Sequence, residues 1–188
     1  MGSHPETDAA PAVTITEGPP LSPQRSTILT TPRLALTTWV PADSAPLNVV
    51  HSDPETMRFI RSGRPESLAE TEQLVASYIE EQETRGWTKW RLTDAQDRLV
   101  GRAGFGPDGH ARELGYTLRR DVWGQGLATE IAAALVDWHL NDTSFAGGLS
   151  AIVIVGHSRS AQVLKKVGFS EVGERDVAGQ RCWSYRLG

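Results

Sequence analysis

The stretch LGYTLRRDVWGQGLATE, residues 114–130, decides the fold. It predicts a short apolar strand, a turn with two glycines and a long amphipathic helix. Where a strand turns into a helix in this way, several backbone N–H groups have no partner and lie at the positive end of the helix dipole. Gly124 and Gly126 let the main chain approach an anion closely because no Cβ intervenes. The stretch therefore predicts a binding site for a phosphate or diphosphate group.

Length and composition describe an ordinary soluble domain. The 188 residues, 39% of them hydrophobic, suffice for one α/β domain with a tail. The net charge of −4 gives no reason to expect a nucleic acid partner. No apolar run approaches the roughly 20 residues that span a bilayer, and no signal-peptide pattern opens the chain. With one cysteine, Cys182, and five scattered histidines, we expect a cytoplasmic protein without disulfide, metal site or membrane partner.

Composition divides the chain into a tail and one domain. Residues 1–26 are rich in Pro, Ala, Thr and Ser and have no periodic apolar face, so they are expected to be disordered. Residues 27–188 form a single domain. The sequence contains no internal repeat and no second domain.

The pattern of apolar residues predicts a mixed α/β (α+β) domain. The expected elements are a strand from Leu34, a short helix capped by Asp43, a second short helix opened by Asp53-Pro54-Glu55, a helix from the Ser67 capping box to Gly86, strands at 87–92, 98–105 and 114–118, a helix at 124–140, a strand at 149–155, a helix at 159–167, and closing strands at 169–176 and 182–187. Residues 106–109 are expected to break the strand before them. The strands at 114–118 and 149–155 flank a crossover helix, so they should be parallel.

Three phosphate-binding motifs compete for the glycine turn. A Walker loop fails because Leu127 and Ala128, and not Lys and Ser or Thr, follow the last glycine. A dinucleotide fingerprint would place Thr129 where a third small residue belongs, without the repeated βαβ units that surround such a motif.

The third possibility depends on several motifs in order. They are Thr31-Pro32-Arg33-Leu34, His51-Ser52-Asp53-Pro54-Glu55, Leu99-Val100-Gly101, Glu113-Leu114-Gly115-Tyr116, Trp123 to Glu130, and Val163 to Phe169. With these motifs, residues 28–187 resemble the GNAT superfamily of N-acetyltransferases, and within it the branch that acetylates ribosomal-protein N-termini. The resemblance implies a largely antiparallel sheet with two splayed parallel strands and flanking helices, and acetyl-CoA as cosubstrate.

The resemblance also implies where coenzyme A binds. Its diphosphate is expected on the backbone of the loop 121–129, which contains the predicted cofactor-binding residues Trp123, Gly124, Gln125, Gly126, Leu127, Ala128 and Thr129. Asp121 stands where the family often has Gln or Arg, and we expect it to cap backbone N–H groups or point away. Because neighbouring residues of a strand point to opposite faces, one of Arg119 and Arg120 is expected to supply the positive charge.

The pantetheine arm is expected between the splayed strands. Main-chain groups of Thr117, Leu118 and Arg119 would bind its amides, and one N–H there would bind the thioester oxygen. His157 replaces the family's usual asparagine, and its ring can offer one donor and one acceptor to the arm. Ser160 matches the family's serine at the start of the following helix and is also expected to contact the cofactor.

The implied chemistry is direct attack of an amine on a thioester. Glu113 or a water chain would remove the proton of the ammonium group, because a protonated amine is not nucleophilic. Ser160 would donate a proton to the departing thiolate, with Tyr116 as an alternative acid. Cys182 lies in a predicted strand without a neighbouring base, so we expect a core residue and not an acyl-cysteine.

The acceptor is expected to be a primary amine, in a protein N-terminus or in a small molecule such as a polyamine or aminoglycoside. Loops near 52–66 and 106–112 would select it. Succinyl-CoA in place of acetyl-CoA, a monomer or a homodimer, and a CoA-binding sensor without turnover all remain open alternatives.

Overall fold

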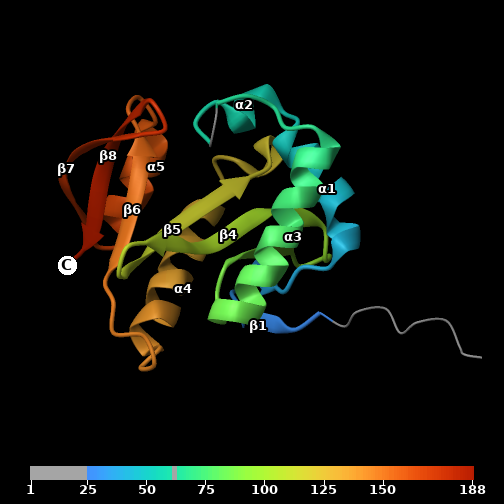
Figure 1. The fold of residues 1–188 in the computed structure, drawn as a ribbon, viewed down its shortest axis with the longest axis horizontal. Helices are drawn as coiled ribbons and strands as arrows, with labels where there is room; N and C mark the ends of the chain where they lie inside the picture. Colours follow the sequence, from blue (N-terminus) through green and yellow to red (C-terminus); the bar gives the residue numbers. More distant parts are fainter. Residues whose placement is uncertain (1–24, 61–62) are drawn as a thin grey trace, which may run out of the picture.

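The computed structural model describes residues 25–60 and 63–188. Their helices and strands form one α/β arrangement (Figure 1). The strands are β1 (Thr27–Thr30), β2 (Leu34–Thr37), β3 (Lys89–Asp94), β4 (Leu99–Asp108), β5 (Ala111–Leu118), β6 (Leu149–Ile154), β7 (Phe169–Val177) and β8 (Gln180–Leu187). The α-helices are α1 (Ser44–His51), α2 (Pro54–Met57), α3 (Leu68–Arg85), α4 (Leu127–Asn141) and α5 (Ser158–Lys166), and short 3-10 helices cover Pro41–Asp43 and Arg120–Val122.

The eight described strands form one sheet in the order β1-β2-β3-β4-β5-β6-β8-β7. Every neighbouring pair is antiparallel except β5 and β6, which are parallel and joined by α4. This confirms the mixed, largely antiparallel sheet and the parallel crossover unit that the sequence predicts. In Figure 1, α1 and α3 cover the near face of β4 and β5, α4 lies behind, and α5 accompanies β6.

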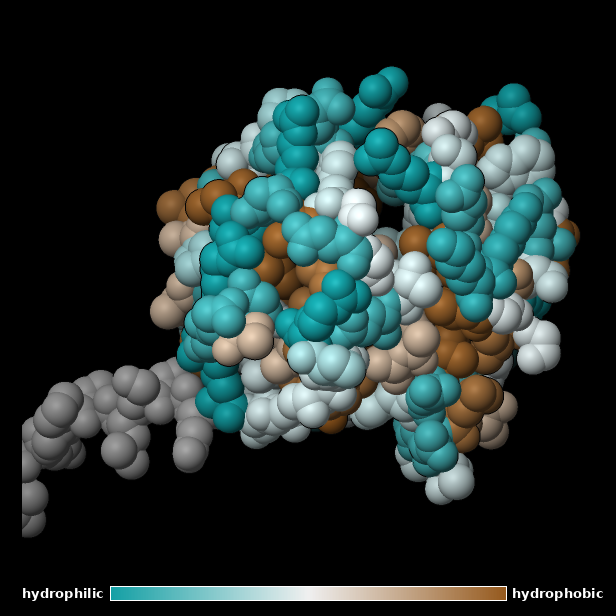
Figure 2. Space-filling view, turned by 180° about the vertical axis from the view of Figure 1, so that it is seen from behind, coloured by the Kyte–Doolittle hydropathy of each residue, from teal (hydrophilic) through white to brown (hydrophobic). Residues whose placement is uncertain are grey.

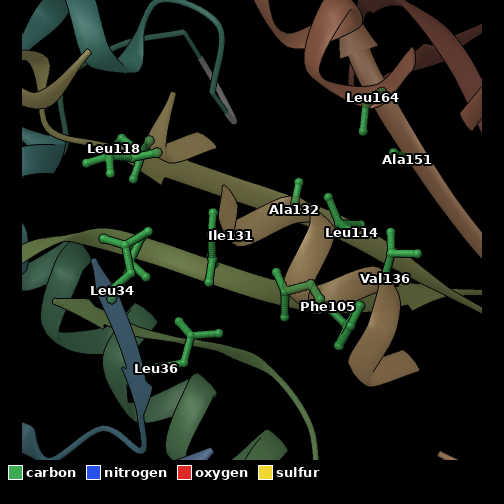
Figure 3. Packing of buried hydrophobic residues seen from close by; sticks show 14 of the residues in the cluster. Leu34, Leu36, Phe105, Leu114, Leu118, Ile131, Ala132, Val136, Ala151 and Leu164 are labelled. Atoms are coloured by element: carbon green, nitrogen blue, oxygen red, sulfur yellow. The ribbon is translucent and has the colours of Figure 1, made fainter. Parts of the chain in front are cut away.

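The main core lies between α4 and the rear face of the sheet. Figure 3 shows Ile131, Ala132 and Val136 of α4 directed toward Phe105 and Leu114 of the strands. All five side chains are buried. A second, smaller cluster packs α1 and α3 onto the other face. The sheet is therefore covered on both faces where the strands are longest.

Local sequence signals set the ends of α3. The Ser67 side chain accepts a hydrogen bond from the Glu70 backbone, and the Glu70 carboxylate accepts one from the Ser67 N–H, which completes a capping box. Gly86 ends the helix with φ of 76°, a left-handed conformation that glycine adopts without strain. Both ends are as predicted.

Two strand predictions were wrong. The sequence analysis missed β1, a four-residue strand held by its pairing with β2. It also placed a break at 106–109, whereas β4 continues to Asp108 and pairs with β5 throughout. Pro107 is tolerated because β3 begins at Lys89, opposite Gly104, so no strand there requires the N–H that proline lacks.

A buried arginine ties α4 and its following loop to β5. Arg112 is 2% exposed and donates a hydrogen bond to Asp142 at 2.6 Å. Its guanidinium group lies over four aromatic rings, those of Trp87, Phe105, Trp138 and Phe145. These cation–π contacts and the ion pair offset the cost of burying the charge. Trp90 belongs to the buried core, and the partly buried Trp87 packs against it.

The predicted disordered tail lies largely outside the described residues, which begin at Arg25. Arg25 pairs with Asp43, the Ser26 N–H donates to the Thr38 hydroxyl, and the Thr38 N–H donates to the Ser26 carbonyl. The chain thus contacts the domain from the first described residue onward. None of the helices in the described ranges combines the length and the apolar character needed to cross a membrane.

We predict that Gly101→Ala weakens the sheet. A Cβ at this position would lie 1.9 Å from the Thr117 carbonyl oxygen on β5, and the φ of 155° is one that L side chains rarely adopt. The expected loss of unfolding free energy is at least about 2 kcal/mol, measured by urea denaturation. Gly148→Ala is the matched control because open space surrounds that position, and its effect should stay within about 0.5 kcal/mol. Equal effects of the two substitutions would contradict this account.

Candidate functional site

The site begins where β5 and β6 part. The two strands share only the residue pairs Arg112↔Leu149 and Glu113↔Ser150, although both continue well beyond them. Asp108 holds this point: it accepts hydrogen bonds from Ser150 Oγ at 2.6 Å and from Arg175 Nη1 at 3.0 Å. Beyond it the strands diverge, as the predicted splay requires.

A cavity of about 1000 Å³ opens between the diverging strands. Figure 2 shows the molecule hollowed there, in the upper part and toward the side that carries β6–β8. The cavity reaches from α3 across β4 and β5 to the start of α5. Predicted site residues on its lining are Glu113, Tyr116, His157 and Ser160. The tertiary structure therefore brings together residues that are up to 47 positions apart.

Alternation along β5 decides which backbone groups face the gap. The Arg119 N–H donates a hydrogen bond to the Val100 carbonyl at 2.8 Å, so the backbone of Arg119 pairs with β4. Since alternate residues of a strand bond opposite neighbours, Thr117 also faces β4, whereas Tyr116 and Leu118 face β6. Of the predicted main-chain ligands Thr117, Leu118 and Arg119, only Leu118 directs its N–H into the gap. The register favours Leu118, and the cofactor contacts of all three residues stay a prediction.

The loop before α4 is a cradle of backbone donors. Gly124 and Gly126 have φ of 76° and 79°, and α4 starts at Leu127 instead of the expected position 124. Among the described residues, none accepts a hydrogen bond from the N–H groups of residues 124–129. Successive unpaired N–H groups at a helix N-terminus attract anions. The geometry matches what a diphosphate requires.

Charged side chains beside the loop pair with one another. Asp121 does not cap the backbone, the first of the two expected arrangements; it forms ion pairs with Arg98 at 3.0 Å and with Arg119 at 3.1 Å. The Arg119 charge is therefore already compensated. Arg120 is exposed and has no described carboxylate within ion-pair distance, so it is the better placed of the two arginines to meet an anion.

Two further contacts fix the loop in place. The Trp123 indole N–H donates to the Leu118 carbonyl at 2.8 Å. Glu130 accepts hydrogen bonds from the Thr31 hydroxyl and the Arg33 guanidinium, both at 2.6 Å, and Arg33 also donates to the Gln125 carbonyl. Glu130 thus ties the cradle to the β1–β2 turn.

The two candidate acids contact each other. Tyr116 Oη and Ser160 Oγ lie 2.9 Å apart, which joins β5 to the first turn of α5. Burial raises the pKa of Tyr116, although the hydrogen bond with Ser160 lowers it. The phenol is therefore protonated at neutral pH, and the pair can pass a proton across the gap.

His157 precedes α5 and lines the cavity. Its ring stacks on Phe59, with 4.5 Å between the ring centroids and 7° between the planes. Burial, with the nearby charge of Arg159, lowers the pKa of His157. The ring is thus neutral at pH 7, with one donor and one acceptor, as predicted for contact with a polar arm.

Glu113 lies among opposing charges. Burial raises the pKa of Glu113, while the positive charges of Lys89 and Arg175 lower it and Asp108 raises it. Arg175 Nη2 donates to the Glu113 carboxylate at 3.1 Å. A carboxylate with a raised pKa, aimed into a cavity, is suited to accept a proton.

Sequence reasoning missed several lining residues. Lys89 and Arg102 come from β3 and β4, and α3 contributes a polar stripe. The stripe consists of Glu70, Gln73, Ser77 and Glu81. Its helical spacing was visible in the sequence, but nothing there showed which element it faces. Sequence reasoning also missed Arg175 of β7, which contacts the lining residue Glu113. Parts of the two predicted acceptor loops also line the cavity, at residues 59–60, 64, 66 and 106–107.

Cys182 borders the cavity but is suited to packing. It is 2% exposed, and burial raises the pKa of its thiol. A protonated thiol is a poor nucleophile. No group of three or more potential metal ligands occurs in the part of the chain that the structure describes.

Fold and site together resemble known acyl-group transferases. Residues 33–170 match the family described as "Acetyltransferase (GNAT) domain". The chain belongs to this family. As a GNAT protein with the complete fold of the family, it is an acetyl-CoA-dependent acetyltransferase.

Individual relatives agree with this assignment. The chain is 28% identical to YkkB of Bacillus subtilis over 161 residues, which covers 76% of this chain and 84% of YkkB. RimL, a ribosomal α-N-protein acetyltransferase in complex with coenzyme A, is 18% identical with a TM-score of 0.73, covering 86% and 97% of the chains. A Vibrio cholerae spermidine N-acetyltransferase bound to CoA and spermine is 16% identical with a TM-score of 0.67, covering 82% and 94%.

We predict that Arg175→Gln raises the pKa of Glu113 further, because the substitution removes a positive charge that stabilises the carboxylate. The measurement is an NMR titration of the Glu113 side-chain carboxyl in both proteins. Arg181→Gln is the control, since Arg181 pairs with Glu174 on the exposed side of the same hairpin. An unchanged or lowered pKa in Arg175→Gln would refute the electrostatic role.

Proposed function

We propose that this protein transfers an acetyl group from acetyl-CoA to a primary amine by direct attack of the amine on the thioester. The observation that carries the proposal is the cavity at the β5–β6 gap. It joins a half-buried carboxylate, Glu113, a hydrogen-bonded Tyr116–Ser160 pair, and a strand edge with unpaired backbone groups. The N–H cradle at residues 124–129 lies at the other end of the same strand.

Each part of the cosubstrate has a matching feature. The diphosphate would bind the N–H groups of residues 124–129, with Arg120 beside them. The pantetheine arm would add as a strand along β5, where Leu118 and Tyr116 offer backbone groups, and His157 would contact its amides. One gap-facing N–H would stabilise the thioester oxygen as it gains negative charge.

Proton transfers are assigned to groups on both sides of the gap. Glu113 would remove the proton of the incoming ammonium, directly or through water, because its raised pKa keeps it a useful base near neutral pH. The Tyr116–Ser160 pair would return a proton to the departing thiolate. Cys182 takes no part, so the reaction needs no acyl-enzyme.

Relatives act on both kinds of amine acceptor. RimL carries the name of a ribosomal α-N-protein acetyltransferase, and the Vibrio cholerae neighbour that of a spermidine N-acetyltransferase. The acceptor proposed here is a primary amine that enters between α3 and residues 59–60, 64, 66 and 106–107. Acetyl-CoA is the proposed donor, and the enzyme is proposed to act in the cytoplasm as a monomer or homodimer without a metal.

Gly124→Val should weaken CoA binding at least about tenfold, because a branched side chain in the cradle keeps the charged diphosphate away from the backbone N–H groups that would bind it. Calorimetry with CoA measures the change. Gly86→Val is a matched control: both glycines have φ of 76° and open space around them, but Gly86 ends α3. The two variants share the backbone strain, so equal CoA affinities would refute this placement of the diphosphate.

Glu113→Gln should lower kcat by roughly 100-fold or more, the usual scale of general-base catalysis, while CoA affinity stays near that of the unmodified protein. Release of CoA thiol from acetyl-CoA, with a panel of primary amines, measures the rate. Glu72→Gln, on the exposed side of α3, is the control. Tight CoA binding without thiol release on any amine would instead favour a CoA-binding sensor.

A further inference from the structure

One face of the central strands forms a floor under α3. Cross-strand pairs share a face, and Lys89 pairs with Gly104, Gly104 with Gly115, and Gly106 with Glu113. A Cβ at position 106 would lie 2.9 Å from Lys89 Nζ, and one at 115 would lie 2.8 Å from Lys89 Cε. These two glycines therefore leave the room in which the Lys89 side chain crosses the floor toward Glu113.

Arg102 lies on the same face, two residues before Gly104, and lines the cavity. It is 4% exposed. Its Nε donates to His51 Nε2 at 3.4 Å, and its guanidinium carbon lies 5.9 Å from the centre of the Tyr78 ring. These contacts orient the side chain from behind and leave its two terminal nitrogens for the cavity.

Those terminal nitrogens lack an acceptor within the described part of the chain. No carboxylate among the residues at 25–60 and 63–188 lies within ion-pair distance of Arg102, and none accepts a hydrogen bond from its Nη1 or Nη2. His51, which accepts the hydrogen bond from Arg102, donates a hydrogen bond of its own from Nδ1 to the Glu66 carboxylate at 2.9 Å. A buried guanidinium is always charged and needs acceptors for its five N–H groups.

The carboxylates of the cavity are in the opposite situation, since each has a partner. Glu70 pairs with Arg64, Glu81 accepts from the Thr88 hydroxyl at 2.7 Å, and Glu113 accepts from Arg175. Glu66 is held by His51. Among the described lining residues, the Arg102 terminal nitrogens thus lack a hydrogen-bond partner, whereas each of these carboxylates has one.

We propose that the amine acceptor carries an anionic group, a carboxylate, which Arg102 binds through its terminal nitrogens with Lys89 alongside. This inference rests on the proposed acetyltransferase function and names its acceptor class. A planar carboxylate can accept two parallel hydrogen bonds from a guanidinium, which gives both affinity and orientation.

The register of the strands sets the size of this acceptor. Arg102 pairs with Thr117, and Glu113 lies four residues back on the same strand, about 13 Å away at 3.3 Å per residue. Even after both side chains reach inward, the amine and the carboxylate must be several bonds apart. The fitting acceptors are ω-amino acids, or peptides with an acidic side chain near their N-terminus, and not α-amino acids.

The test compares matched acceptors that differ only in the anion. One arm uses δ-aminovalerate against pentylamine, and the second uses a short peptide with glutamate at its second position against the same peptide with glutamine. Initial rates of CoA thiol release give kcat/KM for each. We expect the carboxylated member of at least one arm to be favoured about tenfold or more, the scale of one charge-assisted hydrogen bond. The arm that shows the preference indicates whether the natural acceptor is a small molecule or a peptide.

Variants then attribute the preference to Arg102. In Arg102→Met the ratio within each pair should fall toward one, in Arg102→Lys it should be partly kept, and in Arg181→Gln, whose charge lies outside the cavity, it should be unchanged. Thermal denaturation and CoA affinity report whether each variant is folded. Equal rates within both pairs, or a preference that survives in folded Arg102→Met, would overturn the inference.

A binding measurement separates this inference from the proposed function. Calorimetry with δ-aminovalerate and pentylamine on the CoA-bound protein requires no turnover. If no amine releases thiol, the acetyltransferase proposal fails, yet binding of the carboxylated amine that depends on Arg102 still supports the anion site. If water alone satisfies Arg102, neither amine is preferred in binding, and the anion site is refuted.

Discussion

The parting of β5 and β6 after two residue pairs is the constraint on which the rest of the structure depends. In a closed sheet the backbone groups of the two strands would bond each other, and no cavity would exist. Here hydrogen bonds among Asp108, Ser150 and Arg175 hold the strands together where they part. The buried Arg112, surrounded by aromatic rings, ties this point to α4 and its following loop. Beyond it, an edge of unpaired backbone groups faces open space, which a strand-like ligand can complete.

Buried charges around this opening divide into two groups. Glu113 is desolvated, so its proton affinity is raised, and Lys89 and Arg175 limit that rise. Arg102 is more deeply buried, and it is linked to the Glu66 carboxylate only indirectly, through His51. Charges in a cavity of low polarity act more strongly than charges in water. The low polarity of the cavity therefore strengthens both proposed roles, that of Glu113 as a base for the amine and that of Arg102 as a binding group for an anion.

Much of the fold was predictable because its signals are local. The capping box at Ser67, the left-handed Gly86, and the apolar stripe of α4 depend on residues close in sequence. The missed strand β1 is short and exists through its pairing with β2, and β4 runs through Pro107 because the neighbouring strand begins too late to need its N–H. Both depend on neighbours that a pattern of residue types does not reveal.

The sequence by itself determined the glycine turn, the crossover unit and the order of motifs that identify the family, and with them Glu113, Tyr116, His157 and Ser160 as candidates. Only the tertiary structure decided which backbone groups of β5 face the gap, that Asp121 pairs with arginines, that Lys89 and Arg102 line the cavity, and that Arg175 contacts Glu113. The reason is physical: periodicity fixes the face of an element on which a side chain lies, whereas its partners come from segments far away along the chain.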